Sequence, residues 1–190
     1  MLGFNFIGLV LFLVILGIEI YRLVKKKSSI YEFVFRIMFL VYVLFVVMIV
    51  FFPIPYKKEI IEYKKASGLG DIHNFVPFKM ISNFLKNTSF RYMLKQIGGN
   101  FILLLPLSIF VKLFLKDKKS TRFVFLIGFL STCFIEITQG VIGLILDFQY
   151  RVVDVDDIIL NFTGYVVGVF VATKIIQPFC NRFFNNVKNK

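Results

Sequence analysis

Residues 123–146 read FVFLIGFLSTCFIEITQGVIGLIL, a run of 24 residues in which Glu136 is the one charged side chain. A helix needs about 20 mostly apolar residues to cross the hydrocarbon core of a bilayer. The run shows no alternation of apolar and polar residues of the kind that marks a barrel strand. Backbone polar groups inside lipid must be satisfied within the protein, so the run predicts a membrane-spanning helix.

Further apolar runs lie on both sides of this one. The run 37–54 carries no charge and is closed by Pro53 and Pro55. In the run 97–115, Pro106 predicts a kink and not an end, because neighbouring helices can satisfy the carbonyl that a proline leaves free. The predicted fold is all-α, a polytopic bundle of about five membrane helices at 2–24, 37–54, 97–115, 123–146 and 158–176.

The composition of the 190 residues agrees with this class. Hydrophobic residues make up 58% of the chain and charged residues only 18%. A soluble domain has roughly 45–50% apolar and about 25% charged residues, so this chain has too little polar surface for a water-soluble fold. The prediction is an integral membrane protein.

A net charge of +12 can indicate a nucleic-acid-binding protein, but the positions of the basic residues indicate a membrane topology instead. With five spans, 14 of the 23 Lys and Arg fall on the side of segments 19–36, 112–122 and 174–190. Basic residues in short loops favour the cytoplasm, and there they face an anionic leaflet. We therefore expect a cell-membrane protein with an outside N-terminus and a cytoplasmic C-terminus, and no nucleic-acid partner.

This topology divides the chain into four parts. Residues 1–55 hold two spans, 56–96 form a long extracytoplasmic loop, 97–178 form a core of three spans, and 179–190 are a basic cytoplasmic tail. Within the loop, Met80, Ile81, Phe84 and Leu85 share one helical face. That pattern predicts a short helix that either lies in the membrane interface or re-enters the membrane as a lid.

The fourth span carries the first candidate site residues. Glu136 and Gln139 are three residues apart and so share one helix face. Counted from Phe123 at the inner surface, Glu136 lies roughly 20 Å along the helix, in the outer half of the membrane. An ionisable group at that depth is costly and is by default a functional candidate, although a buried ion pair or a protonated carboxyl that joins helices would also explain it.

The fifth span supplies a second polar face. Asp157, Asn161, Gly164 and Gly168 recur at helical spacing, and Asp154 lies one turn earlier. The two glycines favour close packing against another span. Asp157 could also serve as the N-cap of this helix. With Arg151 nearby and Asn100 at the outer end of the third span, we expect these polar residues to meet with Glu136 and Gln139 in one outward-facing pocket.

The spaced residues form a pattern: Asn100 and Pro106, then Glu136 and Gln139, then Arg151, Asp154, Asp157, Asn161, Gly164 and Gly168. This pattern resembles the VanZ-like membrane proteins. The stretch NFVPFK at 74–79 is similar to one that those proteins often carry before the third span. The resemblance covers roughly residues 72–176. It implies that the three spans within residues 97–178 form a VanZ-like core.

The resemblance implies a role in the Gram-positive cell envelope that lowers susceptibility to teicoplanin-type lipoglycopeptide antibiotics. Those drugs act outside the cell, at lipid-linked and nascent cell-wall precursors. The implied partners are membrane lipids or lipid-linked cell-wall precursors. No cofactor, metal or oligomeric state is assigned.

Two mechanisms remain open. In the first, the protein is an enzyme, a hydrolase or transferase, with Glu136 as the general acid or base and Asp157 as the second catalytic candidate. Asp154 and Asp157 would hold a cation or a water molecule. Arg151 and Asn161 would bind a phosphate or a sugar. In a binding protein, the same groups would recognise a lipid headgroup or stabilise the bundle. No nucleophile motif accompanies the carboxylates, which favours binding. The candidates for binding are Asn100, Gln139, Arg151, Asp154 and Asn161.

Overall fold

The computed structural model describes residues 3, 5–66, 73–87, 89–115, 120–148, 150–180 and 182. Within them the named secondary-structure elements are all helices, and an isolated bridge pairs Asn74 with Asp154. It divides into two compact units, which are described one at a time: Met1–Gly70 with Leu146–Tyr150, and Asp71–Ile145 with Arg151–Lys190. Most of the predicted basic tail at 179–190 lies outside the described residues.

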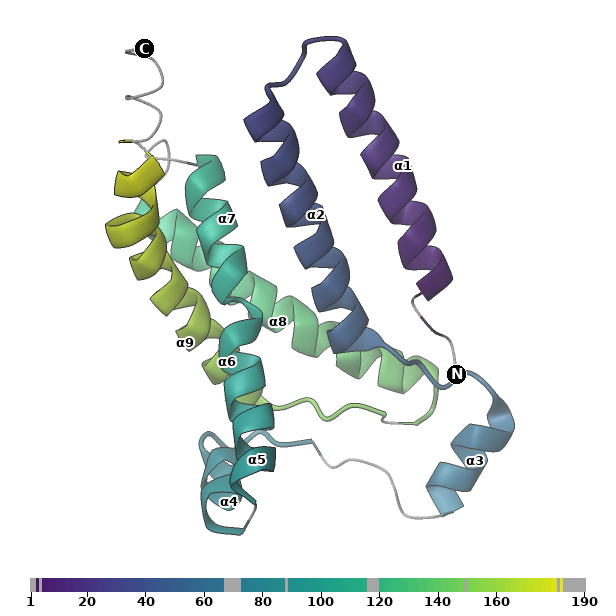
Figure 1. The fold of residues 1–190 in the computed structure, drawn as a ribbon. Helices are drawn as coiled ribbons and strands as arrows, with labels where there is room; N and C mark the ends of the chain where they lie inside the picture. Colours follow the sequence, from purple (N-terminus) through teal and green to yellow (C-terminus); the bar gives the residue numbers. More distant parts are fainter. Residues whose placement is uncertain are drawn as a thin grey trace. The chain divides into compact units, whose positions relative to one another are not determined.

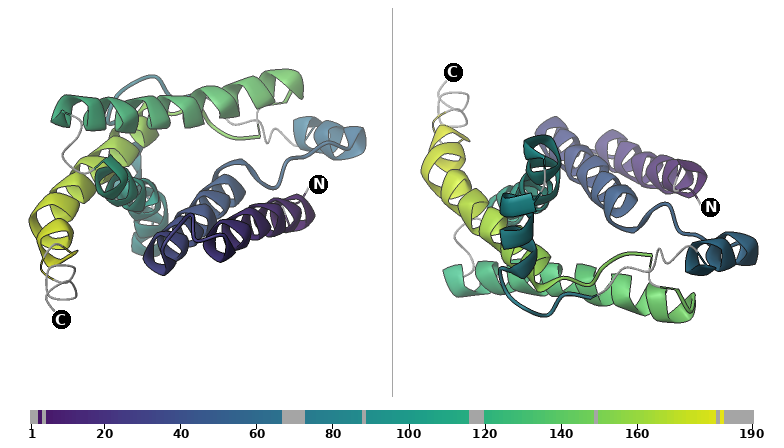
Figure 2. Two further views of the ribbon diagram at one scale, coloured as in Figure 1. Left: turned by 90° about the horizontal axis from the view of Figure 1, so that it is seen from above. Right: turned by 90° about the horizontal axis from the view of Figure 1, so that it is seen from below.

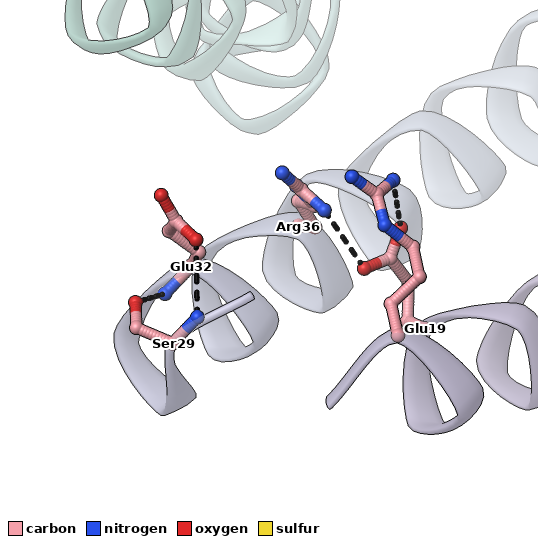
Figure 3. Close-up of polar contacts among 5 residues, drawn as sticks. Glu19, Ser29, Glu32 and Arg36 are labelled. Atoms are coloured by element: carbon pink, nitrogen blue, oxygen red, sulfur yellow. Dashed lines mark hydrogen bonds and ion pairs between the residues drawn. The ribbon is translucent and has the colours of Figure 1, made fainter. Parts of the chain in front are cut away.

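The first unit is built on two long helices, α1 (Asn5–Val24) and α2 (Ile30–Phe51), which pack against each other (Figure 1). A short turn joins them, and a third, shorter helix, α3 (Lys58–Ala66), follows. Helix α2 begins seven residues before the predicted span. Ser29 and Glu32 form a capping box there, in which each side chain accepts a hydrogen bond from the other residue's backbone N–H (Figure 3). This cap places the polar first turn inside the helix.

Glu19 joins α1 to α2 through an ion pair (Figure 3). Its carboxylate is 3.1 Å from the guanidinium of Arg36 on α2 and 3.4 Å from that of Arg22 on its own helix. Glu19 is buried, and a buried carboxylate without such partners would destabilise the fold. The two arginines therefore stabilise the Glu19 carboxylate between two otherwise apolar helices.

Residues 146–150 belong to the same unit. The Lys65 ammonium lies 2.7 Å from Oδ2 of Asp147, and the Tyr150 hydroxyl donates to the carbonyl oxygen of Phe51 over 3.2 Å. The hydrogen bond and charge of Lys65 lower the pKa of the Asp147 carboxyl. Asp147 is fully exposed, so this pair adds little stability.

The second unit contains the other helices. Two short helices, α4 (Lys79–Asn87) and α5 (Phe90–Met93), precede a π-helical turn η1 (Leu94–Gly98), then α6 (Gly99–Leu103) and α7 (Leu105–Leu115). The longest uninterrupted α-helix in the described part of the chain is α8 (Thr121–Ile145). The last is α9 (Val155–Val171), which continues into a π-helical turn, η2 (Ala172–Ile176).

Pro106 interrupts the helix that runs from Phe90 to Leu115. Leu104, between α6 and α7, has φ −100° and ψ 1°, outside helical values. A proline has no N–H to donate to the carbonyl four residues earlier, here that of Ile102, and its ring crowds that carbonyl. The helix resumes at once, with the N–H of Ser108 3.3 Å from the carbonyl oxygen of Leu104. The break is local, as the sequence predicted.

Helix α9 is the centre of this unit, because it packs against α6, α7 and α8. Figure 2 shows these helices from above and below. On the α8 side, the ring of Tyr165 covers Gly128, where a Cβ atom would lie only 2.4 Å from it. The Tyr165 hydroxyl donates to the carbonyl oxygen of Val124 over 3.0 Å. The buried tyrosine therefore ties α9 to α8 through both its ring and its hydroxyl.

Four helices among the described residues are long and apolar enough to cross a membrane: Ile30–Phe51, Phe90–Leu115, Thr121–Ile145 and Val155–Cys180. The protein is thus an all-helical, multi-pass membrane protein. The run 2–24 forms α1, and its crossing of the membrane as a fifth span stays a prediction. Each of the four spans begins before its predicted start, because its first turns contain charged residues and a search for apolar runs leaves these turns out.

Candidate functional site

The site begins at the isolated bridge between the segment before α4 and the segment before α9. The Asn74 N–H donates to the Val153 carbonyl oxygen, and the Val155 N–H donates to the Asn74 carbonyl oxygen, both over 3.0 Å. The side-chain amide of Asn74 then donates to Oδ1 of Asp154 over 2.7 Å. Three hydrogen bonds therefore fix these two segments, which are about 80 residues apart in the sequence.

Asp154 is the N-cap of α9. Its Oδ1 also accepts a hydrogen bond from the N–H of Asp156 over 2.8 Å, and its backbone is extended, as caps require. The alternative that Asp157 caps this helix is wrong, because α9 begins at Val155 and Asp157 already lies in its first turn. Burial raises the pKa of the Asp154 carboxyl despite the hydrogen bonds from Asp156 and Asn74. Its second oxygen, Oδ2, is buried and has no hydrogen-bond partner.

Glu136 reaches this cap from α8. Its Oε2 accepts the backbone N–H of Asp154 over 3.0 Å, and the residue is only 3% exposed. Gly140, one turn further along α8, lies against Val153, since a Cβ atom there would be 3.1 Å from its side chain. The segment before α9 is therefore packed directly onto the face of α8 that carries Glu136.

A second contact joins α9 to α6. The side-chain amide of Asn100 donates to Oδ1 of Asp157. Asn161, one turn after Asp157, is 1% exposed, and its Oδ1 has no hydrogen-bond partner. It lies between Asp157 and Gly164, both of which contact α6, so helical spacing puts Asn161 on that same face.

The two glycines of α9 lie where the helix backbones come closest. A Cβ atom on Gly164 would be 1.7 Å from the Phe101 carbonyl oxygen. A Cβ atom on Gly168 would be 2.0 Å from Oγ of Ser108 and 2.5 Å from the Leu105 carbonyl oxygen. Only glycine fits these positions without moving the third span away from α9.

Asp156 also belongs to this region, although its place in the sequence did not mark it as a candidate. Its carboxylate accepts backbone hydrogen bonds from Phe78, from Met80 over 2.8 Å and from Ile81 over 3.1 Å. These N–H groups open α4, where a carboxylate satisfies free donors and complements the helix dipole. Phe78 has a φ of 63°, a conformation that costs energy for a non-glycine residue. Asp156 thus fastens α4 to the start of α9.

His73, Gln139 and Arg151 lie near the residues described above. Nδ1 of His73 accepts the N–H of Val153 over 3.2 Å, so the histidine supports the bridge. Gln139 is buried on α8 one turn from Glu136, and Arg151 is partly buried three residues before Asp154. That Gln139 and Arg151 contact a ligand stays a prediction.

Three carboxyl groups lie close together at the start of α9 and on the facing side of α8. The carboxyl of Glu136 interacts electrostatically with those of Asp154 and Asp157. The donors described above for these three carboxylates are all uncharged backbone or side-chain amides. No group of three or more His, Cys, Asp or Glu among the described residues is arranged to hold a metal ion. We call Glu136, Asp154, Asp157, Asn100 and Asn161 the acidic cluster.

Similarity to known proteins is found at the level of a family model. No curated protein and no solved structure matches the sequence. A family model, VanZ/LLP1, matches residues 39–177. The match includes every member of the acidic cluster, the bridge at Asn74 and the two packing glycines, and it covers well over half of the chain. The protein belongs to the VanZ/LLP1 family.

Proposed function

We propose that this protein lowers the susceptibility of a Gram-positive cell envelope to teicoplanin-type lipoglycopeptides. It does so by binding or altering a lipid or lipid-linked cell-wall component at the acidic cluster. The family supports the envelope role. The observation that carries the proposal is the pair of buried oxygens without a partner, Oδ2 of Asp154 and Oδ1 of Asn161.

Such oxygens are costly in a folded protein. Leaving one buried acceptor unsatisfied costs about 1–3 kcal/mol, and buried polar groups are almost always paired. The cap of α9 does not account for the unpaired oxygen of Asp154, because the cap uses the other oxygen of that side chain. A ligand that donates to both oxygens would recover this energy on binding.

An enzyme is the second candidate, and one observation favours it. Glu136 is buried and accepts a single described backbone hydrogen bond, beside two further carboxyls, so it is placed as an acid or base. Asp157 would then act with it, while Gln139, Arg151 and Asn161 would hold the substrate. The histidine near the cluster, His73, already accepts a backbone N–H through Nδ1. We therefore favour binding over hydrolysis or transfer.

The orientation is part of the proposal. An outside N-terminus and a cytoplasmic C-terminus put the start of α9, and with it the cluster, at the outer face, where these drugs act. The excess of Lys and Arg on the other side supports this topology. A C-terminal fusion to green fluorescent protein should be fluorescent, and a fusion to alkaline phosphatase should be inactive. The opposite result would reverse the orientation.

The experiment is teicoplanin susceptibility of a sensitive Gram-positive host that expresses the wild type, Glu136→Gln or Asp157→Asn at equal abundance in the membrane. The control is Asp147→Asn, which removes an exposed carboxylate outside the cluster. The proposal predicts that the wild type and the control protect and that both cluster variants fail. If the wild type gives no protection, the proposed function is wrong; if all variants protect, the carboxylates are structural.

A further inference from the structure

Helix α4 and its flanking turns leave large apolar side chains uncovered. Part of the apolar face of α4 packs inside the unit, where the ring of Phe84 contacts that of Tyr92 on α5 with 5.7 Å between their centroids. Four other apolar side chains are each at least 61% exposed: Phe75, Phe78, Leu85 and Phe90. The first three precede the span that begins at Phe90, so the hydrocarbon around a spanning helix does not cover them.

The ionisable side chains of the same stretch are basic, apart from one histidine. Residues 73–98 contain no Asp or Glu and four Lys or Arg, all of them exposed: Lys79, Lys86, Arg91 and Lys95. Lys79 and Lys86 are seven residues apart on α4, so they share one face, which is turned away from Phe84. Exposed apolar side chains beside several Lys and Arg are typical of a helix that lies on an anionic lipid surface.

Two connections hold α4 at the level of the membrane surface. Asp156, in the first turn of α9, accepts the N–H groups of Met80 and Ile81, so α4 begins beside the start of the span Val155–Cys180. Helix α4 ends three residues before Phe90, where the span Phe90–Leu115 begins (Figure 1). Both ends of α4 are therefore close to the beginning of a span, at the depth where interfacial helices bind.

The backbone of Phe78 supports this placement. Its φ of 63° costs energy for a non-glycine residue, and Asp156 accepts its N–H. The fold thus holds an aromatic side chain in a costly turn and leaves it exposed. Contact with lipid would remove the ring from water and recover hydrophobic energy, and aromatic side chains are common at the membrane interface.

We propose that the α4 segment, residues 75–87 and 89–95, is a docking surface for anionic lipids. Its exposed apolar side chains insert between the lipids, and its four basic side chains contact the phosphates. The basic charges place α4 in the interface, because charged side chains that re-enter the hydrocarbon core are costly. This surface goes beyond the proposed function and does not depend on a ligand at the acidic cluster.

The test uses tryptophan fluorescence, because the chain contains no Trp and one introduced Trp reports on a single position. Full-length Leu85→Trp is reconstituted in bilayers of equal parts phosphatidylcholine and phosphatidylglycerol, with bromine on the acyl chains of one lipid at a time. Bromine quenches a Trp that it contacts. One basic residue near an anionic surface is worth about fivefold in affinity, so brominated phosphatidylglycerol should quench at least about twofold more than brominated phosphatidylcholine.

Two further reporters define the orientation of α4. Asn83→Trp puts the reporter two residues from Leu85, on the opposite side of the helix, and should be quenched much less by either lipid. Phe75→Trp should be quenched like Leu85→Trp. It keeps the test decisive if the substitution at Leu85 lowers the yield of folded protein.

Charge variants in the Leu85→Trp protein connect the lipid preference to the basic residues. Lys79→Gln/Lys86→Gln and Arg91→Gln/Lys95→Gln should each reduce the excess quenching by phosphatidylglycerol and keep the quenching by phosphatidylcholine. The matched control is Arg122→Gln/Lys174→Gln, which removes two exposed basic residues at the other ends of the spans. It should keep the full excess. All substituted positions are exposed, and the Tm of each variant checks that it is folded.

The other outcomes overturn the proposal in different ways. Equal quenching by the two lipids would show a lipid surface without a preference for anionic lipid. Quenching of Asn83→Trp as strong as that of Leu85→Trp would show a helix inserted into the hydrocarbon core. No quenching at either Leu85 or Phe75 would show that the segment faces water or a protein partner. Each of these results leaves the proposed function standing, because none of the variants changes the acidic cluster.

Discussion

The side-chain amide of Asn74 lies 2.7 Å from Oδ1 of Asp154, the carboxylate that caps α9. Together with the two backbone hydrogen bonds of the bridge, this contact fixes the segment before α4 at the entrance of a membrane span. The same Asp154 offers its N–H to Glu136 of α8. One residue thus connects α8, α9 and the segment that leads to α4.

Replacement of Asn74 by Ala should destabilise this connection. Asp154 would lose a donor while still buried, which costs about 1–3 kcal/mol. The Tm in detergent should fall, and protease should cut the segment before α4 more readily. Asn83→Ala, on an exposed position of α4, is the matched control and should leave both measurements unchanged. Equal behaviour of the two variants would contradict the role of the bridge.

Asp156→Asn tests the attachment of α4. The amide keeps one acceptor oxygen but loses the charge and the second oxygen, so the N–H groups of Phe78, Met80 and Ile81 lose a shared partner. Hydrogen exchange at residues 78–82 should become about tenfold faster, as expected for a loss of about 1.4 kcal/mol.

The control for this variant is Glu59→Gln, which removes an acid from the first turn of the exposed helix α3. It should leave exchange at residues 78–82 as in the wild type. Unchanged exchange in Asp156→Asn would show that α4 is held by other contacts.

Gly164→Ala should disrupt the packing of α9 against the third span. The new methyl group would overlap the Phe101 carbonyl oxygen, which belongs to the backbone and cannot rotate away. Such overpacking costs about 3 kcal/mol and should lower both the Tm and the yield of folded protein. Gly99→Ala is the control, since a Cβ atom there meets nothing within 4 Å. A wild-type Tm for Gly164→Ala would refute the close contact.

Much of the fold follows from local sequence. The apolar runs predicted the four long helices, and the position of Pro106 predicted the break beside Leu104. Helical spacing put Asp157, Asn161 and Gly164 on one face of α9, where the structure has them. These features depend on residues within a few helical turns of each other, so the periodicity of the sequence is enough to predict them.

The pairings over long distances could not be predicted in this way. Asn74 and Asp154 meet across about 80 residues, and Asp156 caps a helix 75 or more residues away. The periodicity of the sequence does not show which loop contacts which helix cap, because that contact depends on how the helices pack. The available signal was the stretch NFVPFK at 74–79, which the family resemblance marked without giving its partner.

The stability of Asp154→Asn should depend on pH in a defined direction. Burial raises the pKa of the Asp154 carboxyl, so its ionised form costs stability in the folded protein. This cost is absent at a pH below the ordinary value of about 3.9 and grows as the pH rises through the raised pKa. Asn keeps an oxygen for Asn74 and Asp156 without the charge.

The Tm of Asp154→Asn relative to the wild type should therefore increase from acidic to neutral pH. At neutral pH the variant should be at least as stable as the wild type. Measuring the difference between the two proteins at each pH removes the contribution of groups that they share. A difference that decreases toward neutral pH would contradict a destabilising charge at this position.

The most direct test of the central claim is teicoplanin susceptibility of cells that express Asp154→Asn at wild-type abundance. The claim is that the negative charge of Asp154 serves a ligand and is not needed for folding. It predicts a folded protein with an undiminished Tm that no longer protects, while Asp147→Asn protects like the wild type. Full protection by a stable Asp154→Asn protein would contradict it.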